Sequence, residues 1–317
     1  MQKSFSTKNF VRRESTRIAG ALLLYFLLST LIFDGVPLVA TLIMGESFTI
    51  FRDCTEPVFS DLLLMLSYVT SFAVPILILS RGSEVEWRFV RPKLRFLVLI
   101  LPLLLAMLQV GTFVSSIFGP LFRAVGIRSY ETGITLPDST FRWVLFVVQY
   151  ILLPAVFEEL LFRGVILDRL RRFGELFAVL SSGVLFAVLH LQIAALPGVF
   201  LMAVCFGYLT VVSESLIPSM VLHALNNLLA IGDSLARQYL DSSMVQKIYS
   251  VIFIAGLMSV LLLTLEYMSE RRKQNGRFQL KKPLSEEREE RWRIFISLPM
   301  ILFFFIAGRL MLIMERR

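Results

Sequence analysis

The stretch Pro154-Ala-Val-Phe-Glu-Glu-Leu-Leu-Phe-Arg-Gly-Val-Ile-Leu-Asp168 places two adjacent carboxylates, Glu158 and Glu159, among apolar residues. This pattern predicts a helix within a membrane, where ionisable side chains are rare and mark functional sites. Glu159 and Arg163 are four residues apart and share a helix face, so they can neutralise each other. Glu158 is rotated by about 100° from its neighbour and can point elsewhere. We expect Glu158 to be available for chemistry; the alternative is a buried ion-pair cluster that only fixes helix packing.

Composition places the chain among membrane proteins. Hydrophobic residues make up 56% of the 317 residues, above the roughly 45–50% typical of soluble domains. A helix of about 20 apolar residues crosses the hydrocarbon core of a bilayer. The sequence predicts an all-α, polytopic transmembrane bundle whose nine apolar runs lie near residues 18–44, 61–80, 95–119, 142–171, 175–194, 197–212, 216–232, 246–268 and 294–314.

The net charge of +8 is spread over alternate loops and does not form one patch. This distribution follows the positive-inside rule and argues against nucleic-acid binding. It predicts a multi-pass protein of the cell membrane with a cytoplasmic N-terminus and an external C-terminus. The expected parts are a basic cytoplasmic tail (1–17), N-terminal transmembrane helices (18–139), core helices with the acidic motif (140–232), and C-terminal transmembrane helices (233–317) with a charged cytoplasmic loop at 270–293.

The chain has only two histidines, and both lie in later apolar runs. His190 ends the sequence Phe186-Ala-Val-Leu-His190, and His223 begins His223-Ala-Leu-Asn-Asn227. Because Asn227 follows His223 by four residues, the two share a helix face and can donate to one point. A single histidine in a core is usually just hydrogen-bonded, but two of them beside two buried acids indicate a site.

Spacing predicts that these residues meet at one depth. Phe173 and Gly174 are typical of the turn of a helical hairpin, with Glu158 15 residues before Phe173 and His190 16 residues after Gly174. At about 1.5 Å per residue, both would lie some 22–24 Å from the turn. A second turn near residues 213–215 puts His223 and Asn227 about 12–18 Å from it on the same side, so helix tilt is needed for all four residues to converge on one cavity.

A carboxylate, two imidazoles and an amide can activate water. Glu158 would act as general base with His190 holding the same water, and His223 and Asn227 would donate to the oxyanion formed at a peptide carbonyl. The serines of these runs have no triad partner at matching depth. No cofactor is then needed, although Glu158, His190 and His223 could instead supply three zinc ligands.

The three motifs resemble those of the CAAX protease and bacteriocin-processing family (CPBP, or Abi) of intramembrane glutamate endopeptidases, in its Rce1-like form. They read Glu158-Glu159-Leu-Leu-Phe-Arg163, Phe186-Ala-Val-Leu-His190 and His223-Ala-Leu-Asn-Asn227. The resemblance covers residues 140–232 and implies an eight-helix core, to which the ninth span would be an addition. It also implies that Glu158 and His190 activate water, that His223 and Asn227 bind the oxyanion, and that Glu159, Arg163 and Phe186 support them.

The expected partners are membrane lipids and a peptide or membrane protein, including a prenylated or otherwise lipidated one, as substrate. Two other classes of function stay open at this point. A transporter could use buried acids for protons or ions, although the sequence has no internal repeat. A non-catalytic membrane scaffold could keep the same cluster for packing.

Overall fold

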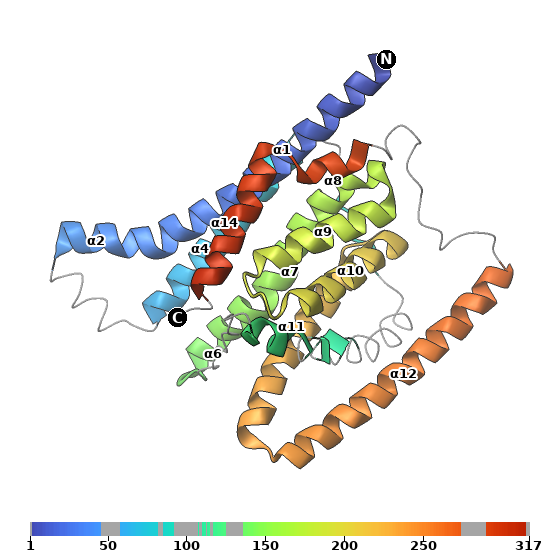
Figure 1. The fold of residues 1–317 in the computed structure, drawn as a ribbon. Coiled ribbons are helices and arrows are strands. Elements are labelled where there is room, and N and C mark those ends of the chain that lie inside the picture. The colour runs from blue at the N-terminus through green and yellow to red at the C-terminus, as the bar shows by residue number, and fades with distance from the viewer. Residues whose placement is uncertain are drawn as a thin grey trace.

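The structure, a computed structural model, describes residues 2–45, 58–81, 85–91, 136–273 and 290–314, with residues 107, 110, 111, 113, 114 and 117–124 between them. Every regular element in these residues is a helix, which confirms the all-α prediction (Figure 1). The third predicted span, 95–119, lies mostly outside the described residues, as does most of the predicted loop 270–293.

One group of helices is formed by the two ends of the chain. α1 (Gln2–Thr30) continues through a π-helical turn, η1 (Leu31–Gly35), into α2 (Val36–Met44). α1 packs against both α4 (Val58–Ser80) and α14 (Leu298–Met314). The short helix η5 (Arg291–Phe295) precedes α14 and also contacts α1. Figure 1 shows the blue α1 and the red α14 crossing side by side.

The central helix runs from residue 140 to residue 173 with changes of helical type. Its parts are α6 (Thr140–Val147), η2 (Val148–Leu152), α7 (Leu153–Glu159), η3 (Leu160–Leu167), α8 (Asp168–Leu170) and η4 (Arg171–Phe173). The π-helical η3 begins directly after the two glutamates, at Leu160. Wide turns of this kind occur often at functional sites, because they re-aim the side chains beside them.

The predicted hairpin turn is confirmed. The central helix ends at Phe173, and Gly174 has a φ of 103°, which a residue with a side chain rarely adopts. The chain then reverses into α9 (Glu175–Leu189), which packs against η3. The second predicted turn is confirmed as well, because α10 (Leu196–Ser213) ends before the left-handed Glu214 and α11 begins three residues later.

The last helices complete the bundle. α10 packs against α9 and against α11 (Ile217–Tyr239), and α11 returns to the central helix at α7. α12 (Ser242–Lys273) contacts α11 and extends away from the other helices in Figure 1. The core helices therefore place the first motif across α7 and η3, the second at the end of α9, and the third on α11.

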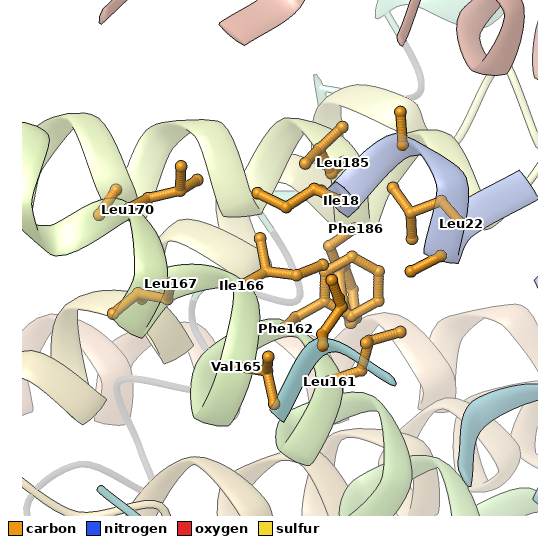
Figure 2. Close-up of a cluster of buried hydrophobic side chains, with 14 of the residues drawn as sticks. Ile18, Leu22, Leu161, Phe162, Val165, Ile166, Leu167, Leu170, Leu185 and Phe186 are labelled. Atoms are coloured by element: carbon orange, nitrogen blue, oxygen red, sulfur yellow. The ribbon is translucent and has the colours of Figure 1, made fainter. Parts of the chain in front are cut away.

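A buried apolar cluster joins the N-terminal group to the central helix. Side chains of α1, η3, α8 and α9 lie together in Figure 2, and the labelled ones are at most 3% exposed. Ile18 and Leu22 come from α1, and Leu185 and Phe186 come from α9. The aromatic rings of Phe162 and Phe186 meet edge to face, with their centroids 5.1 Å apart. This contact places the neighbouring polar residues of the same helices at fixed positions.

Five helical stretches in the described part of the chain are long and apolar enough to cross a membrane. They are Lys8–Met44, Val58–Ser80, Thr140–Phe173, Leu196–Ser213 and Ser242–Leu262. Glu175–Leu189 and Leu298–Ile313 are apolar but shorter. The prediction of a multi-pass membrane protein is therefore confirmed, although not every one of the nine predicted runs reaches full spanning length.

Residues 2–17 form the first part of α1 and do not have the exposure of a solvated tail, which their charge suggested. Val11 and Ser15 are fully buried. The Ser15 hydroxyl contacts the Ile294 carbonyl and lies 2.6 Å from the Ser297 hydroxyl. The cause is the C-terminal group, η5 and α14, which packs against this end of α1 and gives the polar residues partners that the local sequence does not reveal.

Candidate active site

Glu158 lies near the end of α7, where its two carboxylate oxygens have different surroundings. The Tyr68 hydroxyl of α4 donates a hydrogen bond of 2.6 Å to Oε1. Oε2 is buried and has no hydrogen-bond partner among the described residues. It lies 3.8 Å from Nε2 of His223. That separation is too long for a direct hydrogen bond, yet one water molecule can contact both atoms.

Glu159 has different partners from Glu158, as the sequence predicted. Its Oε1 accepts a hydrogen bond of 2.8 Å from Nη1 of Arg163 and one of 2.9 Å from Nδ1 of His223. Both the glutamate and the arginine are almost completely buried. Glu159 therefore contacts the predicted Arg163 and also an imidazole that spacing along one helix could not indicate.

Arg163 is enclosed by aromatic rings and a backbone carbonyl. Its Nη2 donates to the Ala203 carbonyl of α10 at 2.9 Å. Its guanidinium carbon lies 4.4 Å from the ring centre of Phe186 and 5.5 Å from that of Phe206. Cation–π contacts of this kind strengthen when water is excluded. The arginine therefore links the central helix to both α9 and α10.

His223 is the residue that joins the two glutamates. A carboxylate can only accept, so Nδ1 carries the proton of the bond to Glu159 and Nε2 is left to face Glu158. The imidazole also stacks on Phe206, with centroids 5.4 Å apart and planes 26° apart. A histidine whose second nitrogen is held by a carboxylate has a fixed orientation and tautomer.

A cavity of about 310 Å³ lies beside this cluster. Its wall contains both histidines and both asparagines of the third motif, on a mostly apolar surface. The other wall residues are Gly111, Phe186, Ala195, Gly198, Val199, Met202 and Phe206. A few convergent polar groups on an apolar wall are typical of ligand sites. His223 reaches both the cavity and Glu158, so it connects the two.

His190 lies in this cavity wall and not directly beside Glu158. It follows the last residue of α9, its side chain is exposed, and its Nδ1 donates to the Phe186 carbonyl at 2.9 Å. Its ring lies 4.6 Å from that of Phe186. The described contacts include none between Glu158 and His190, whose ring is held at the end of α9 by its bond to the Phe186 carbonyl.

Asn227 and Asn226 lie together in the cavity wall. The side-chain amide of Asn226 donates to Oδ1 of Asn227 at 3.3 Å. This bond uses only the oxygen of the Asn227 side chain, so its N–H groups can donate to another acceptor. This arrangement suits a donor aimed at a carbonyl oxygen in the cavity.

Sequence reasoning missed Tyr68 and the contact between His223 and Glu159. Tyr68 lies in an apolar run that carries no motif, 90 residues before its partner. Only knowledge of how α4 packs on α7 reveals it. Among the described residues, no group of three or more His, Cys, Asp or Glu side chains is arranged to hold a metal ion.

Residues 140–229 match the family model described as Rce1-like, type II CAAX prenyl endopeptidase Rce1-like. The match includes all three motifs and confirms the resemblance expected for residues 140–232. No match was found to a curated protein or to a solved structure. This segment is therefore similar to membrane proteases of the CAAX type, and the apolar helices around it fit a membrane protein.

Proposed function

We propose, on the premise that residues 140–229 form an Rce1-like segment, that this protein is an intramembrane endopeptidase of the glutamate type. The observation that carries the proposal is the buried Oε2 of Glu158, which lacks a partner among the described residues and lies 3.8 Å from His223. A buried carboxylate oxygen without a partner is costly. A bound water molecule would satisfy it and would be the nucleophile.

The reaction uses each polar group of the site once. The water oxygen attacks the peptide carbonyl carbon while its proton passes to Oε2 of Glu158. The carbonyl oxygen becomes an oxyanion and accepts hydrogen bonds from Asn227 and from Nε2 of His223. For this bond the His223 ring carries a proton on each of its two nitrogens. The C–N bond then breaks, and the proton held by Glu158 passes to the leaving nitrogen.

The remaining residues hold these groups in place. Glu159 fixes the orientation of His223 through Nδ1, and Arg163 balances the charge of Glu159. His190 binds the water or the substrate from the cavity side. Its Nδ1 is used in the bond to the Phe186 carbonyl, so Nε2 makes this contact. The mechanism requires no metal ion. The apolar wall suits the chain of a membrane peptide or of a lipidated protein.

The substrate enters from the bilayer of the cell membrane, in which the N-terminus faces the cytoplasm. This orientation is inferred from the basic loops, which lie on the cytoplasmic side in most membrane proteins.

The test compares the purified wild-type protein with the Glu158→Gln variant in lipid vesicles. Both would be given membrane proteins and prenylated or unmodified peptides, and the new chain ends would be identified by mass spectrometry. We expect cleavage by the wild type and none by Glu158→Gln, because an amide cannot take the proton. The matched control is Glu214→Gln, which changes an exposed acid of the same segment and should cleave at the wild-type rate.

Three outcomes would contradict the proposal. Loss of cleavage on addition of a chelator, with recovery on addition of zinc, would indicate a zinc peptidase. Absence of cleavage by the wild type, with ion or solute flux in the same vesicles, would indicate a transporter. Absence of both cleavage and flux would indicate a scaffold.

A further inference from the structure

The short contact between Tyr68 and Glu158 joins the family-matched segment to a helix outside it. Tyr68 belongs to α4, and the match begins only at residue 140. The distance of 2.6 Å between the hydroxyl oxygen and Oε1 falls in the range of about 2.5–2.7 Å that is typical of an O–H donor on an ionised carboxylate. Such bonds are roughly twice as strong as those between neutral groups.

The surroundings of Tyr68 hold its hydroxyl in one place. Its ring packs on Phe72, with centroids 4.7 Å apart, and Phe72 also contacts the ring of Tyr25 at 4.8 Å. Phe72 is 1% exposed and belongs to the main apolar core. A phenol ring packed in this way has few rotamers available, so its hydroxyl is a preorganised donor.

The geometry of Glu158 shows what the hydrogen bond does. A glutamate carboxylate rotates easily about its last bond, and this rotation exchanges its two oxygens. With Oε1 held by Tyr68, Oε2 is directed to the side where Nε2 of His223 lies, at 3.8 Å. Without that bond, either oxygen could turn away from the imidazole.

We propose that Tyr68 is a positioning residue, which fixes the Glu158 carboxylate so that only Oε2 faces the water and His223. This inference rests on the proposed function. It makes α4 a part of the active site, since the carboxylate is oriented only when α4 is docked on α7.

The test is Tyr68→Phe, which removes the hydroxyl and keeps the packed ring. We expect kcat to fall by about 10- to 100-fold, the usual range when a residue that orients an active group is lost. KM should stay within about two-fold, because Tyr68 does not line the cavity and the loss affects the transition state alone. The control is Tyr239→Phe, which removes a hydroxyl from an exposed tyrosine at the end of α11 and should leave both constants unchanged.

A second variant separates positioning from packing. p-Aminophenylalanine at position 68 places an N–H donor where the hydroxyl was, and it should bring kcat back to within about five-fold of the wild type. Rates are expressed per folded protein, judged by the melting temperature and by gel filtration. Equal losses in the phenylalanine and p-aminophenylalanine variants would show a packing role only and overturn the inference.

The proposed function and the inference fail in different ways. If Glu158→Gln cleaves as fast as the wild type, the proposed function is overturned and the positioning role with it. If Glu158→Gln is inactive while Tyr68→Phe keeps the wild-type kcat, only the positioning role is overturned.

Discussion

Two arginines on the central helix, Arg163 and Arg169, each form a buried ion pair with a glutamate. The two pairs differ in how many of their polar atoms have a hydrogen-bond partner. Arg169 donates to both carboxylate oxygens of Glu14, at 2.7 and 3.0 Å, and its third nitrogen donates to the Leu79 carbonyl. Every nitrogen is used, and the group joins α8 to α1 and α4. The Arg169 pair is therefore a structural connection between helices.

The Arg163 pair is left incomplete. Arg163 donates to Glu159 and to the Ala203 carbonyl, but its Nε has no partner among the described residues. Oε1 of Glu159 is shared with His223, which turns its other nitrogen towards the partnerless Oε2 of Glu158. Burial is equally deep in the two regions, so depth alone does not indicate function. Polar atoms without partners beside a cavity distinguish the Arg163 region.

The largest effect is expected for Arg163→Met. Glu159 would lose its cation while buried, which costs about 3–5 kcal/mol of the free energy of unfolding when one partner of a buried pair is removed. Cleavage would be lost as well, because Glu159 would no longer hold His223 in place. Unfolding in detergent with increasing SDS, and cleavage per folded protein, measure the two effects.

The double variant Glu159→Leu/Arg163→Met sharpens this prediction. Replacing both members of a buried pair by apolar residues is often neutral for stability, so most of the free energy of unfolding should return. Cleavage should not return, since Nδ1 of His223 has no carboxylate to donate to. Recovery of cleavage in the double variant would show that the Arg163 pair serves packing alone.

The second prediction concerns Arg169→Met. Glu14 would lose both hydrogen bonds from Arg169 and keep only Arg17, whose Nη1 lies 3.6 Å from Oε1. The free energy of unfolding should therefore fall by less than the about 3–5 kcal/mol expected for a buried charge left with no partner. The kcat of the folded protein should match the wild type, because Arg169 contacts none of the site residues. Glu14→Leu/Arg169→Met should recover stability and keep cleavage. A fall in kcat in the double variant would mean that the two regions are coupled.

The sequence was sufficient for the local features of this fold and site. Hydropathy predicted the helices, and Phe173 and Gly174 predicted the hairpin because a glycine at a helix end permits the φ of 103° found there. The four-residue spacing predicted the contact between Glu159 and Arg163. Each of these features depends on residues close together in the chain.

The features that the sequence could not predict depend on how distant helices pack. Glu14 meets Arg169 across 155 residues, and Tyr68 meets Glu158 across 90. Matching depth predicted that Glu158 and His190 meet, with His223 and Asn227 nearby. In the structure His190, His223 and Asn227 line one cavity wall, whereas Glu158 is not part of that wall. The distance of each residue from its turn does not show which imidazole faces Glu158, because that also depends on how each helix is rotated about its own axis.

The smallest effect is expected for a third pair, Arg88 and Glu214, which is exposed and 2.9 Å apart. Hydrogen bonding to Glu86 raises the pKa of Arg88, so the guanidinium stays charged at every pH suited to the assays. Arg88→Gln should change the free energy of unfolding by less than about 1 kcal/mol, since water and salt screen exposed pairs. The backbone bond from Leu216 to the Arg88 carbonyl does not depend on the side chain.

Salt provides the measurement for this pair. Raising the ionic strength from about 0.01 to 1 M shortens the screening length from about 30 to 3 Å, and it should remove the small difference between Arg88→Gln and the wild type. The same change should leave the loss in Arg169→Met intact, because water and ions do not reach that buried pair. Suppose instead that Arg88→Gln lowers the free energy of unfolding by several kcal/mol at every salt concentration. The exposure of a pair would then not explain why it contributes less than the buried Arg163 and Arg169 pairs. The number of hydrogen-bond partners and the burial of each pair would then not be enough to distinguish the roles of the three arginines.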